Sequence, residues 1–272
     1  MMSEAAWING EPAADPARTI AFDDRGLNYG DGLFETALLR DGALRFATAH
    51  LRRLRQGCER LGIAYPGDEN LIADIAGISA AARHGVIKII VTRGGGGRGY
   101  RPAANAASTR IVALHPLPAP CNPAGIAARC CEVRLGRNPA LAGMKHLNRL
   151  EQVLAQRECR DAGVEEGLML DTEGELICAT TGNVFLGRRD ALFTPDLRYC
   201  GVHGVMRAQV LEAAVELGIA TSVEPLRPRD LHDATEVFIT NAVRGIRPLI
   251  ALDELQWQAG PLASRLTAAL EL

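Results

Sequence analysis

Alternation of apolar and polar positions predicts β-structure in the first part of the chain. Residues 33–39 (LFETALL) predict a strand that leads into a hairpin turn at Asp41-Gly42. Asn9-Gly10 carries the same turn signal, because Asn-Gly and Asp-Gly tolerate the positive φ angles of tight hairpins. The apolar run 86–91 (VIKIIV) and residues 110–114 predict two further strands. Strands therefore alternate with the helices described next.

Helical spacing of apolar residues predicts two helices in the same part of the chain. The first is expected to have Thr48 as its N-cap and Gly62 as its stop, with a buried face made of Leu51, Leu54, Cys58 and Leu61. A second helix is predicted over 69–83. The stretch 115–125 (HPLPAPCNPAG) has four prolines in eleven residues and is typical of a domain linker.

The chain beyond the linker has its own pattern of elements. Asn148 and Glu151 have the spacing of a capping box, which predicts a helix start at Asn148. The full set comprises a strand at 126–135, a helix at about 148–162, three short strands between 167 and 193, a helix at about 204–217, a strand at 236–240 and a helix from about 260. This predicts a mixed α/β (α+β) fold with a smaller N-terminal domain (1–117), a linker (118–125) and a larger C-terminal domain (126–272).

Composition narrows the classes of protein. The 272 residues have a net charge of −2, and no basic block suggests a nucleic-acid or membrane partner. Apolar runs are too short for a membrane span, and the N-terminal stretch lacks the apolar core of a signal peptide, so we expect a soluble, cytoplasmic protein. Seven scattered cysteines without a CxxC pair, and six isolated histidines, predict reduced thiols and no metal site.

A glycine-rich segment, 94–99 (GGGGRG), follows a predicted strand and fits G-x-G-x-x-G. A dinucleotide site would require a helix next and an acidic residue about 20 positions further on. The chain continues instead into YRPAANAAS, and Pro118–Pro120 occupy the place of the acid. The simplest interpretation of residues 94–99 is a flexible loop. The donors Arg93, Arg98, Tyr100 and Arg101 favour an anionic substrate, because guanidinium and phenol groups bind carboxylates well.

A single lysine, Lys145, stands among the apolar residues Leu141, Met144 and Leu147. A lysine with the reference pKa of about 10.4 is neutral in roughly one molecule in 2,500 at pH 7, and burial of an amine lowers that pKa. Such an amine suits Schiff-base chemistry. The same residues are also consistent with an ordinary surface lysine. The segment HLRRLR (50–55) is consistent with a solvated helix face, although Arg53 lies beside apolar residues.

Several motifs together resemble the fold-type IV pyridoxal-phosphate enzymes, the class-IV aminotransferase family. The resemblance covers almost the whole chain, and GRGY and KHLNRLEQ are specific to the lyase branch of that family, whose members release pyruvate and 4-aminobenzoate from 4-amino-4-deoxychorismate. It is carried by DRGLNYGDGLFET (24–36), HLRRL (50–54), KIIVTRGGGGRGY (88–100), VRLGRNPALAGMKHLNRLEQVL (133–154), GNVF (182–185), GVHGVMR (201–207) and VFITNAV (237–243).

The resemblance implies a two-domain enzyme that is usually a homodimer, with pyridoxal 5′-phosphate in the interdomain cleft and a role in folate biosynthesis. Lys145 would form the Schiff base and act as general acid and base. Substrate-binding positions would be Phe34, Arg98 and Tyr100, the last two often reaching from the second subunit. Cofactor-binding positions, besides Lys145, would be Arg53 at the phosphate, Cys178, Val205, Met206, Asn241 and Ala242.

One position departs from the family pattern. A glutamate that contacts the pyridine nitrogen is expected five residues before Asn183, and Cys178 stands there. Glu173 and Glu175 are near in sequence but out of register, and alternation along a strand would put Glu175 on the other face. An aminotransferase acting on D- or branched-chain amino acids is the nearest alternative, and a protein that holds the cofactor without catalysis is another.

Overall fold

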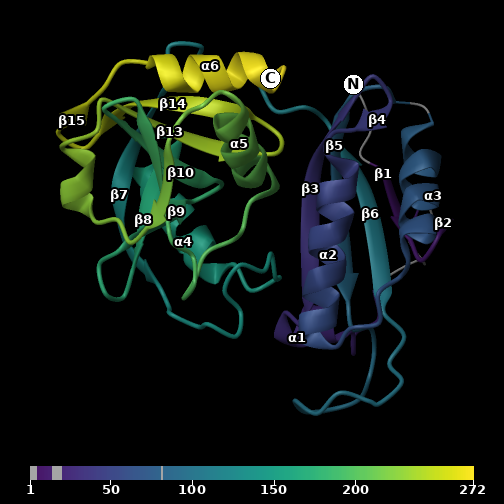
Figure 1. The fold of residues 1–272 in the computed structure, drawn as a ribbon. Coiled ribbons are helices and arrows are strands. Elements are labelled where there is room, and N and C mark those ends of the chain that lie inside the picture. The colour runs from purple at the N-terminus through teal and green to yellow at the C-terminus, as the bar shows by residue number, and fades with distance from the viewer. Residues whose placement is uncertain (1–4, 14–19, 81) are drawn as a thin grey trace. The chain divides into compact units, whose positions relative to one another are not determined.

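The fold has two compact units of mixed α and β structure (Figure 1). The computed structural model describes residues 5–13, 20–80 and 82–272. Unit 1 consists of Met1–Ala119 and Met144–Asn148, and unit 2 consists of Pro120–Gly143 and Arg149–Leu272. Within the described ranges, no helix combines the length and the apolar character that crossing a membrane requires.

Unit 1 is built on an antiparallel six-stranded sheet in the order β2-β1-β6-β5-β3-β4. Alternate residues of β3 point into the core, so Leu33, Ala37 and Leu39 are buried, as the period of two predicts. The strands are β1 (Ala5–Ile8), β2 (Glu11–Pro12), β3 (Gly32–Arg40), β4 (Ala43–Leu44), β5 (Gly85–Thr92) and β6 (Thr109–His115).

Both predicted hairpin turns of unit 1 are confirmed. Asn9 and Gly10 have φ angles of 51° and 92° and connect β1 to β2, while Asp41 and Gly42 have φ angles of 53° and 81° and connect β3 to β4. Two consecutive positive φ angles match the twist of the flanking strands.

Two helices pack on this sheet, α2 (Ala47–Leu61) along β3 and α3 (Asp68–Ser79) against β1 and β6 (Figure 1). The predicted N-cap of the first helix is wrong. Helix α2 begins after Phe46, which has a φ of 54° and no side-chain cap, so Thr48 lies inside the first turn. Gly62 ends the helix at a φ of 63°, as predicted.

Unit 2 is built on a nine-stranded mixed sheet in the order β12-β11-β10-β13-β14-β7-β8-β9, with β15 paired to β14. The pairs β11–β12, β14–β7 and β7–β8 are parallel. The strands are β7 (Ile126–Leu135), β8 (Glu166–Asp171), β9 (Leu176–Ala179), β10 (Asn183–Arg188), β11 (Ala191–Pro195), β12 (Thr221–Glu224), β13 (Glu236–Asn241), β14 (Gly245–Leu252) and β15 (Leu255–Gln256).

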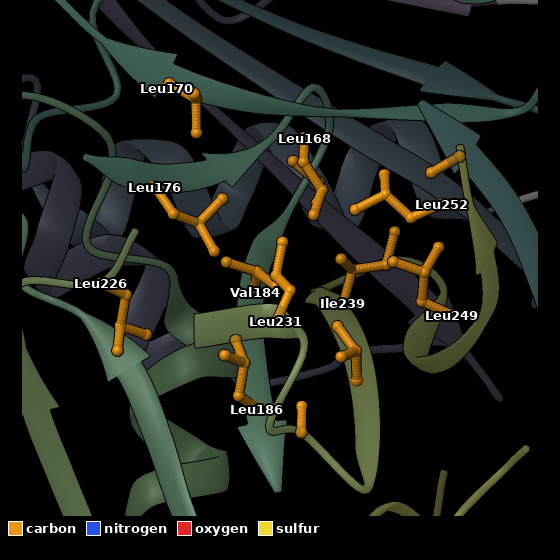
Figure 2. Packing of buried hydrophobic residues seen from close by; sticks show 14 of the residues in the cluster. Leu168, Leu170, Leu176, Val184, Leu186, Leu226, Leu231, Ile239, Leu249 and Leu252 are labelled. Atoms are coloured by element: carbon orange, nitrogen blue, oxygen red, sulfur yellow. The ribbon is translucent and has the colours of Figure 1, made fainter. Parts of the chain in front are cut away.

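The core of unit 2 lies where the curled sheet folds over itself. Figure 2 shows Leu168, Val184, Leu186, Ile239 and Leu249, from four different strands, directed toward one another. Burial of apolar surface on this scale is the main source of stability in such a unit. Helix α4 (Leu150–Asp161) packs on β7 and β8, α5 (Val205–Glu216) packs on β13, and α6 (Pro261–Ala269) packs on β13 and β14. The described residues also form two short helices, α1 (Arg25–Tyr29) in unit 1 and η1 (Pro228–Leu231) in unit 2.

Two further predictions about unit 2 are wrong. The region 167–193 holds parts of four strands rather than three. Helix α4 begins at Leu150 with Arg149 as its N-cap, and no capping box forms. The Asn148 amide donates to the carbonyl of Gly30 (3.3 Å), and Glu151 accepts from the Gly136 amide (2.8 Å), so both side chains of the expected box serve other partners.

The segment Met144–Asn148 groups with unit 1, although the predicted domain division assigned it to the C-terminal domain. The amide of Phe34 donates to the carbonyl of Lys145 (2.9 Å), and the amide of Leu147 donates to the carbonyl of Gly32 (3.0 Å). The segment is therefore attached to the start of β3 by backbone hydrogen bonds, which explains its place in unit 1.

A buried charge cluster attaches α2 to β3. The Glu35 carboxylate is 1% exposed and accepts from Arg53 Nε (2.7 Å), Arg53 Nη2 (2.5 Å) and His50 Nδ1 (2.7 Å). Burial raises the pKa of Glu35, but the charge and hydrogen bonds of Arg53, with those of His50, outweigh it and lower the pKa to about 2. Glu35 therefore stays ionised inside unit 1.

This cluster generates a prediction about acid stability. A carboxyl whose pKa is lowered by folding stabilises the native state above its unfolded pKa, and that contribution is lost as the pH falls toward the folded pKa. For Glu35 the window runs from about 4.5 down to about 2. The stability gap between wild type and Glu35→Gln should thus shrink by about 3 kcal/mol across it.

The measurement is urea unfolding of both proteins at a series of pH values from 7 downward. Glu69→Gln, which removes an exposed carboxylate of α3, controls for the loss of one acidic group. A gap between wild type and Glu35→Gln that stays constant through the window would show that Glu35 does not titrate as described.

Candidate functional site

The Lys145 side chain lies against an aromatic ring of β3. Its Nζ is 4.2 Å from the centroid of the Phe34 ring, and both side chains are half-buried. The face of an aromatic ring attracts a cation, so this contact orients the amine. The structure thus brings together two residues that the sequence assigned to the site, and the backbone pairing with β3 fixes both on one sheet.

The residue two positions before Lys145 is fixed in unit 2. The amide of Gly143 donates to the carbonyl of Gly201 (3.0 Å), and the amide of His203 donates to the carbonyl of Gly143 (3.0 Å). Gly143 has a φ of 81°, and a Cβ there would lie 2.9 Å from His203 Nδ1. Only glycine tolerates both the positive φ angle and the close approach of His203. This position therefore fixes the backbone just before the lysine segment.

The loop that holds Gly143 leads directly into α5. Asn183 donates from Nδ2 to the carbonyl of Val202 (2.9 Å), and a Cβ on Gly204 would lie 2.0 Å from Asn183 Oδ1. Val205 and Met206 are the first residues of α5 and are buried. The first amides of a helix have no partner within the helix and carry its positive dipole end, so this start suits an anion.

The turn after β13 carries two further expected cofactor-binding residues, Asn241 and Ala242. Asn241 Oδ1 accepts from the amides of Val243 (3.1 Å) and Arg244 (2.7 Å), and its Nδ2 donates to the Thr181 carbonyl (3.3 Å). Asn241 therefore shapes the turn, and Ala242 is the small residue at its beginning.

Cys178 is buried in an apolar cluster of unit 2. It pairs with Met169 across β8 and β9 and packs among residues that include Cys131, Ile177 and Cys200. Burial raises the pKa of the Cys178 thiol to about 12, so it is protonated at neutral pH. The thiol therefore lies in apolar surroundings.

Glu175 does not substitute for the missing glutamate. Its carboxylate lies 2.9 Å from Arg137 Nη2 and 3.8 Å from Arg227 Nη2. The predicted reason was strand alternation, but a register shift between β8 and β9 breaks that alternation. The engagement of Glu175 with two arginines is the reason that the structure gives.

Arg98 and Tyr100 lie on an exposed loop of unit 1, and the Tyr100 side chain is 87% exposed. No helix follows the glycine-rich segment, and the chain continues to β6, so the geometry of a dinucleotide-binding turn is absent from this described region. Across the described residues, no three His, Cys, Asp or Glu side chains are grouped so that they could hold a metal ion.

Sequence reasoning missed the partners of Arg53. Glu35 occupies an inward position of β3, in period with Leu33 and Ala37, and His50 is fully buried on α2. A carboxylate at a core position requires a cationic partner. That rule, applied to the strand pattern, would have predicted the pair although not the identity of Arg53.

The sequence and the fold are both similar to those of known proteins. The sequence model of the family described as amino-transferase class IV matches residues 32–252. An aminodeoxychorismate lyase of Vibrio harveyi is 32% identical over 271 residues, which cover 97% of this chain and 98% of that protein. A putative branched-chain-amino-acid aminotransferase of Methanocaldococcus jannaschii is 32% identical over 254 residues, covering 91% and 87%.

A solved structure gives the same result in three dimensions. The crystal structure of 4-amino-4-deoxychorismate lyase from Pseudomonas aeruginosa has 44% sequence identity, a TM-score of 0.91 and 98% coverage of both chains. The family resemblance and the mixed α/β fold predicted from the motifs are confirmed. The chain belongs to the amino-transferase class IV family.

Proposed function

We propose that the protein is a pyridoxal-phosphate-dependent lyase that converts 4-amino-4-deoxychorismate to 4-aminobenzoate and pyruvate, a step of folate biosynthesis. The observation that carries the proposal is the position of Lys145, an amine held by backbone pairing on β3 against the Phe34 ring. The likeness over nearly the whole chain to lyases of Vibrio harveyi and Pseudomonas aeruginosa supports it.

The chemistry of the available donors fits two ends of the cofactor. The primary amine of Lys145 suits an aldehyde, and the guanidinium of Arg53 and the first amides of α5, at Val205 and Met206, suit a phosphate. Asn241 and Ala242 form the turn assigned to the same phosphate. Cys178 fits the ring nitrogen poorly, because a neutral thiol is a weak hydrogen-bond partner.

The protein's part in the reaction rests on Lys145. When bound, pyridoxal phosphate supplies an electron sink for the pair of electrons left behind by a departing proton. Lys145 would hold the cofactor through its side-chain amine. When that amine is free, it would take the proton from the carbon that bears the substrate nitrogen and would return a proton to the enolpyruvyl group, which would leave as pyruvate. The remaining ring becomes aromatic, which drives the step forward.

Substrate carboxylates are assigned to the exposed loop. Arg98 and Tyr100 would contact them, with Phe34 beside the reacting amine. We further propose a cytoplasmic homodimer in which this loop serves the partner subunit's site. Three exposed apolar residues on α4, Leu150, Val153 and Leu154, support a subunit contact, because such a stripe is unfavourable in water.

An aminotransferase is the second candidate. The relative from Methanocaldococcus jannaschii favours it, and an enzyme of that type would transfer the amino group instead of eliminating pyruvate. A protein that only stores the cofactor would do neither. A steady-state assay with 4-amino-4-deoxychorismate, following pyruvate and 4-aminobenzoate, separates the three. Absence of pyruvate release from the loaded wild type would overturn the proposed lyase activity.

The first prediction concerns Lys145. Protein loaded with pyridoxal phosphate should be yellow, and borohydride should bleach the colour and leave the reduced cofactor covalently attached, because the lysine amine forms the link. Lys145→Ala should lose both properties, as read by absorbance and by mass spectrometry of the treated protein. Lys88→Ala is the matched control, since Lys88 Nζ also lies near the Phe34 ring (5.7 Å). A borohydride-stable adduct on Lys145→Ala would show that another residue holds the cofactor.

The second prediction concerns Arg98. Arg98→Ala should raise the KM for the dicarboxylate substrate far more than it weakens cofactor binding. Loss of a charge-assisted hydrogen bond typically costs about 2 to 3 kcal/mol, or roughly 30- to 150-fold. Arg52→Ala, which removes an exposed arginine of α2 outside this loop, is the control and should change KM little. An unchanged KM in Arg98→Ala would remove the loop from the substrate site.

The third prediction concerns Cys178. A glutamate beside the ring nitrogen would favour its protonated form and strengthen the electron sink, and one unit of pKa corresponds to about 1.4 kcal/mol, or tenfold. In Cys178→Glu, half-transamination of a simple amino acid should rise by roughly tenfold and by a larger factor than lyase turnover. The lyase depends less on the sink, since its substrate expels a leaving group.

The control for this prediction is Cys178→Gln, which has the size of glutamate without its charge. Stopped-flow absorbance gives the half-transamination rate, and pyruvate release gives lyase turnover. An equal rise in both rates, or no rise in transamination, would mean that the missing glutamate does not restrain transamination in this protein.

A further inference from the structure

A nearly buried arginine holds the loop that carries Arg98 and Tyr100. The Arg25 side chain is 3% exposed, although arginine is usually a surface residue. Its Nη1 donates to the carbonyl of Gly99 (2.8 Å), and its Nη2 donates to the carbonyl of Tyr100 (2.9 Å). Two parallel bonds from one planar guanidinium fix both the position and the orientation of this stretch of backbone.

Tyr29, one turn further along α1, holds the same stretch from a second direction. The amide of Gly99 donates to the Tyr29 hydroxyl (3.1 Å), and the rings of Tyr29 and Tyr100 have centroids 5.6 Å apart. The Arg25 guanidinium carbon lies 4.8 Å from the centroid of the Tyr29 ring. Gly99 therefore has its carbonyl and its amide bound by neighbouring side chains of one short helix.

The beginning of the loop is attached to the start of the same helix. The amide of Arg25 donates to the carbonyl of Gly94 (2.9 Å), and Asp24 forms an isolated bridge with Gly95. The Thr92 hydroxyl donates to Asp24 Oδ2 (2.8 Å). Between these two anchored ends lie the positions that need freedom, and Gly97 adopts a φ of 81°.

The charge of Arg25 is balanced by Asp31, which also binds Arg93. Arg25 Nε lies 2.9 Å from Asp31 Oδ2, and Arg93 contacts both oxygens of the same carboxylate at 2.8 and 3.0 Å. Burial raises the pKa of Asp31, but the hydrogen bonds and charges of Arg93 and Arg25 together hold it below its ordinary value. The carboxylate therefore remains charged and keeps Arg25 aimed at the loop.

We infer that Arg25 is a positioning residue for substrate binding, which fixes the loop so that Arg98 and Tyr100 are presented to the substrate carboxylates in one orientation. The inference rests on the proposed function of that loop. Without the two bonds from Arg25, the backbone around Gly99 would sample several conformations, and binding would have to order it again. The effect should appear in KM, because the cofactor and the reacting amine do not depend on this contact.

The experiment uses the loaded full chain and the variants Arg25→Lys and Tyr29→Phe. Lysine keeps the charge beside Asp31 but lacks the planar fork that binds two carbonyls, and phenylalanine keeps the ring but removes the acceptor for the Gly99 amide. Arg110→Lys is the matched control, because Arg110 also pairs with a buried aspartate of unit 1, Asp74 (2.7 Å).

The first readout does not depend on activity. Trypsin cleaves after arginine, and the Arg98–Gly99 bond becomes accessible to it only when the loop leaves its anchored conformation. Arg25→Lys should accelerate cleavage of this bond by about tenfold or more, and Tyr29→Phe by less, while the melting temperature stays close to that of Arg110→Lys. The Arg101–Pro102 bond does not interfere, since trypsin does not cut before proline.

The second readout is the kinetic effect. Arg25→Lys should raise KM by roughly fivefold or more with kcat within about twofold, and the affinity for pyridoxal phosphate should not change. In an Arg98→Ala background, the same substitution should add little, because two residues that act through one contact are not additive. Full additivity would indicate a general structural role and would overturn the inference.

The remaining outcomes separate this inference from the proposed function. Unchanged cleavage in an active enzyme overturns the role of Arg25 alone, and so does faster cleavage with an unchanged KM. A wild type that releases no pyruvate overturns the proposed function, together with the substrate part of the inference. Faster cleavage with a raised KM and non-additivity supports both.

Discussion

Backbone pairing between the lysine segment and the start of β3 is the constraint from which the candidate site follows. A lysine side chain has several rotatable bonds, and its amine is useful only if the backbone beneath it is fixed. Here the carbonyl of Lys145 and the amide of Leu147 are bound by β3, and Gly143, just before them, is bound by the loop ahead of α5. Gly143 can follow this path because it tolerates a φ of 81°. The backbone is therefore fixed at Lys145 within unit 1 and at Gly143 within unit 2.

Two carboxylates of unit 1, the buried Glu35 and the half-buried Asp31, use their charge to hold cationic side chains in place. Glu35 binds Arg53 in the middle of α2, and Asp31 binds Arg93, which donates to the carbonyls of Leu61 and Gly62 at the end of that helix. Helix α2 is thus attached to the sheet at two points. Charged hydrogen bonds are directional and short, and Glu35 has an arginine and a histidine as partners, while Asp31 has two arginines. Segments that would otherwise be loosely packed are ordered in this way.

Local chemistry explains which parts of the fold were predictable from the sequence. The hairpins at Asn9-Gly10 and Asp41-Gly42 were predicted because positive φ angles are a property of the dipeptides themselves. The start of α2 was not, since Phe46 adopts a positive φ that only its tertiary surroundings impose. Strand β14 was missed because it contains Pro248 and the charged Arg247, which argue against a central strand.

The site shows the same division between local and distant information. Lys145 stood out because its neighbours in the sequence are apolar, and motifs that resemble a known family assigned its role. Arg53 is oriented by Glu35, which lies in another element of unit 1. Arg25 was likewise hidden, because its two carbonyl partners lie more than 70 residues further along the chain. Long-range pairs of this kind leave no periodic signal.

A thiol and a carboxylate at position 178 differ in the free-energy cost of their burial. The side chain packs among Cys131, Ile177 and Cys200, in surroundings that accept a thiol readily, since free cysteine is among the most buried residue types. A carboxylate there would be desolvated, and it would depend on a cation such as the nearby Arg149 or a protonated ring nitrogen, because a buried charge without full compensation costs several kcal/mol. A thiol removes that dependence, so unit 2 retains its core with or without a positively charged ring nitrogen. Under the proposed function, the corresponding loss would be a weaker electron sink, and a reaction that ends in expulsion of a leaving group and an aromatic ring would tolerate that loss best.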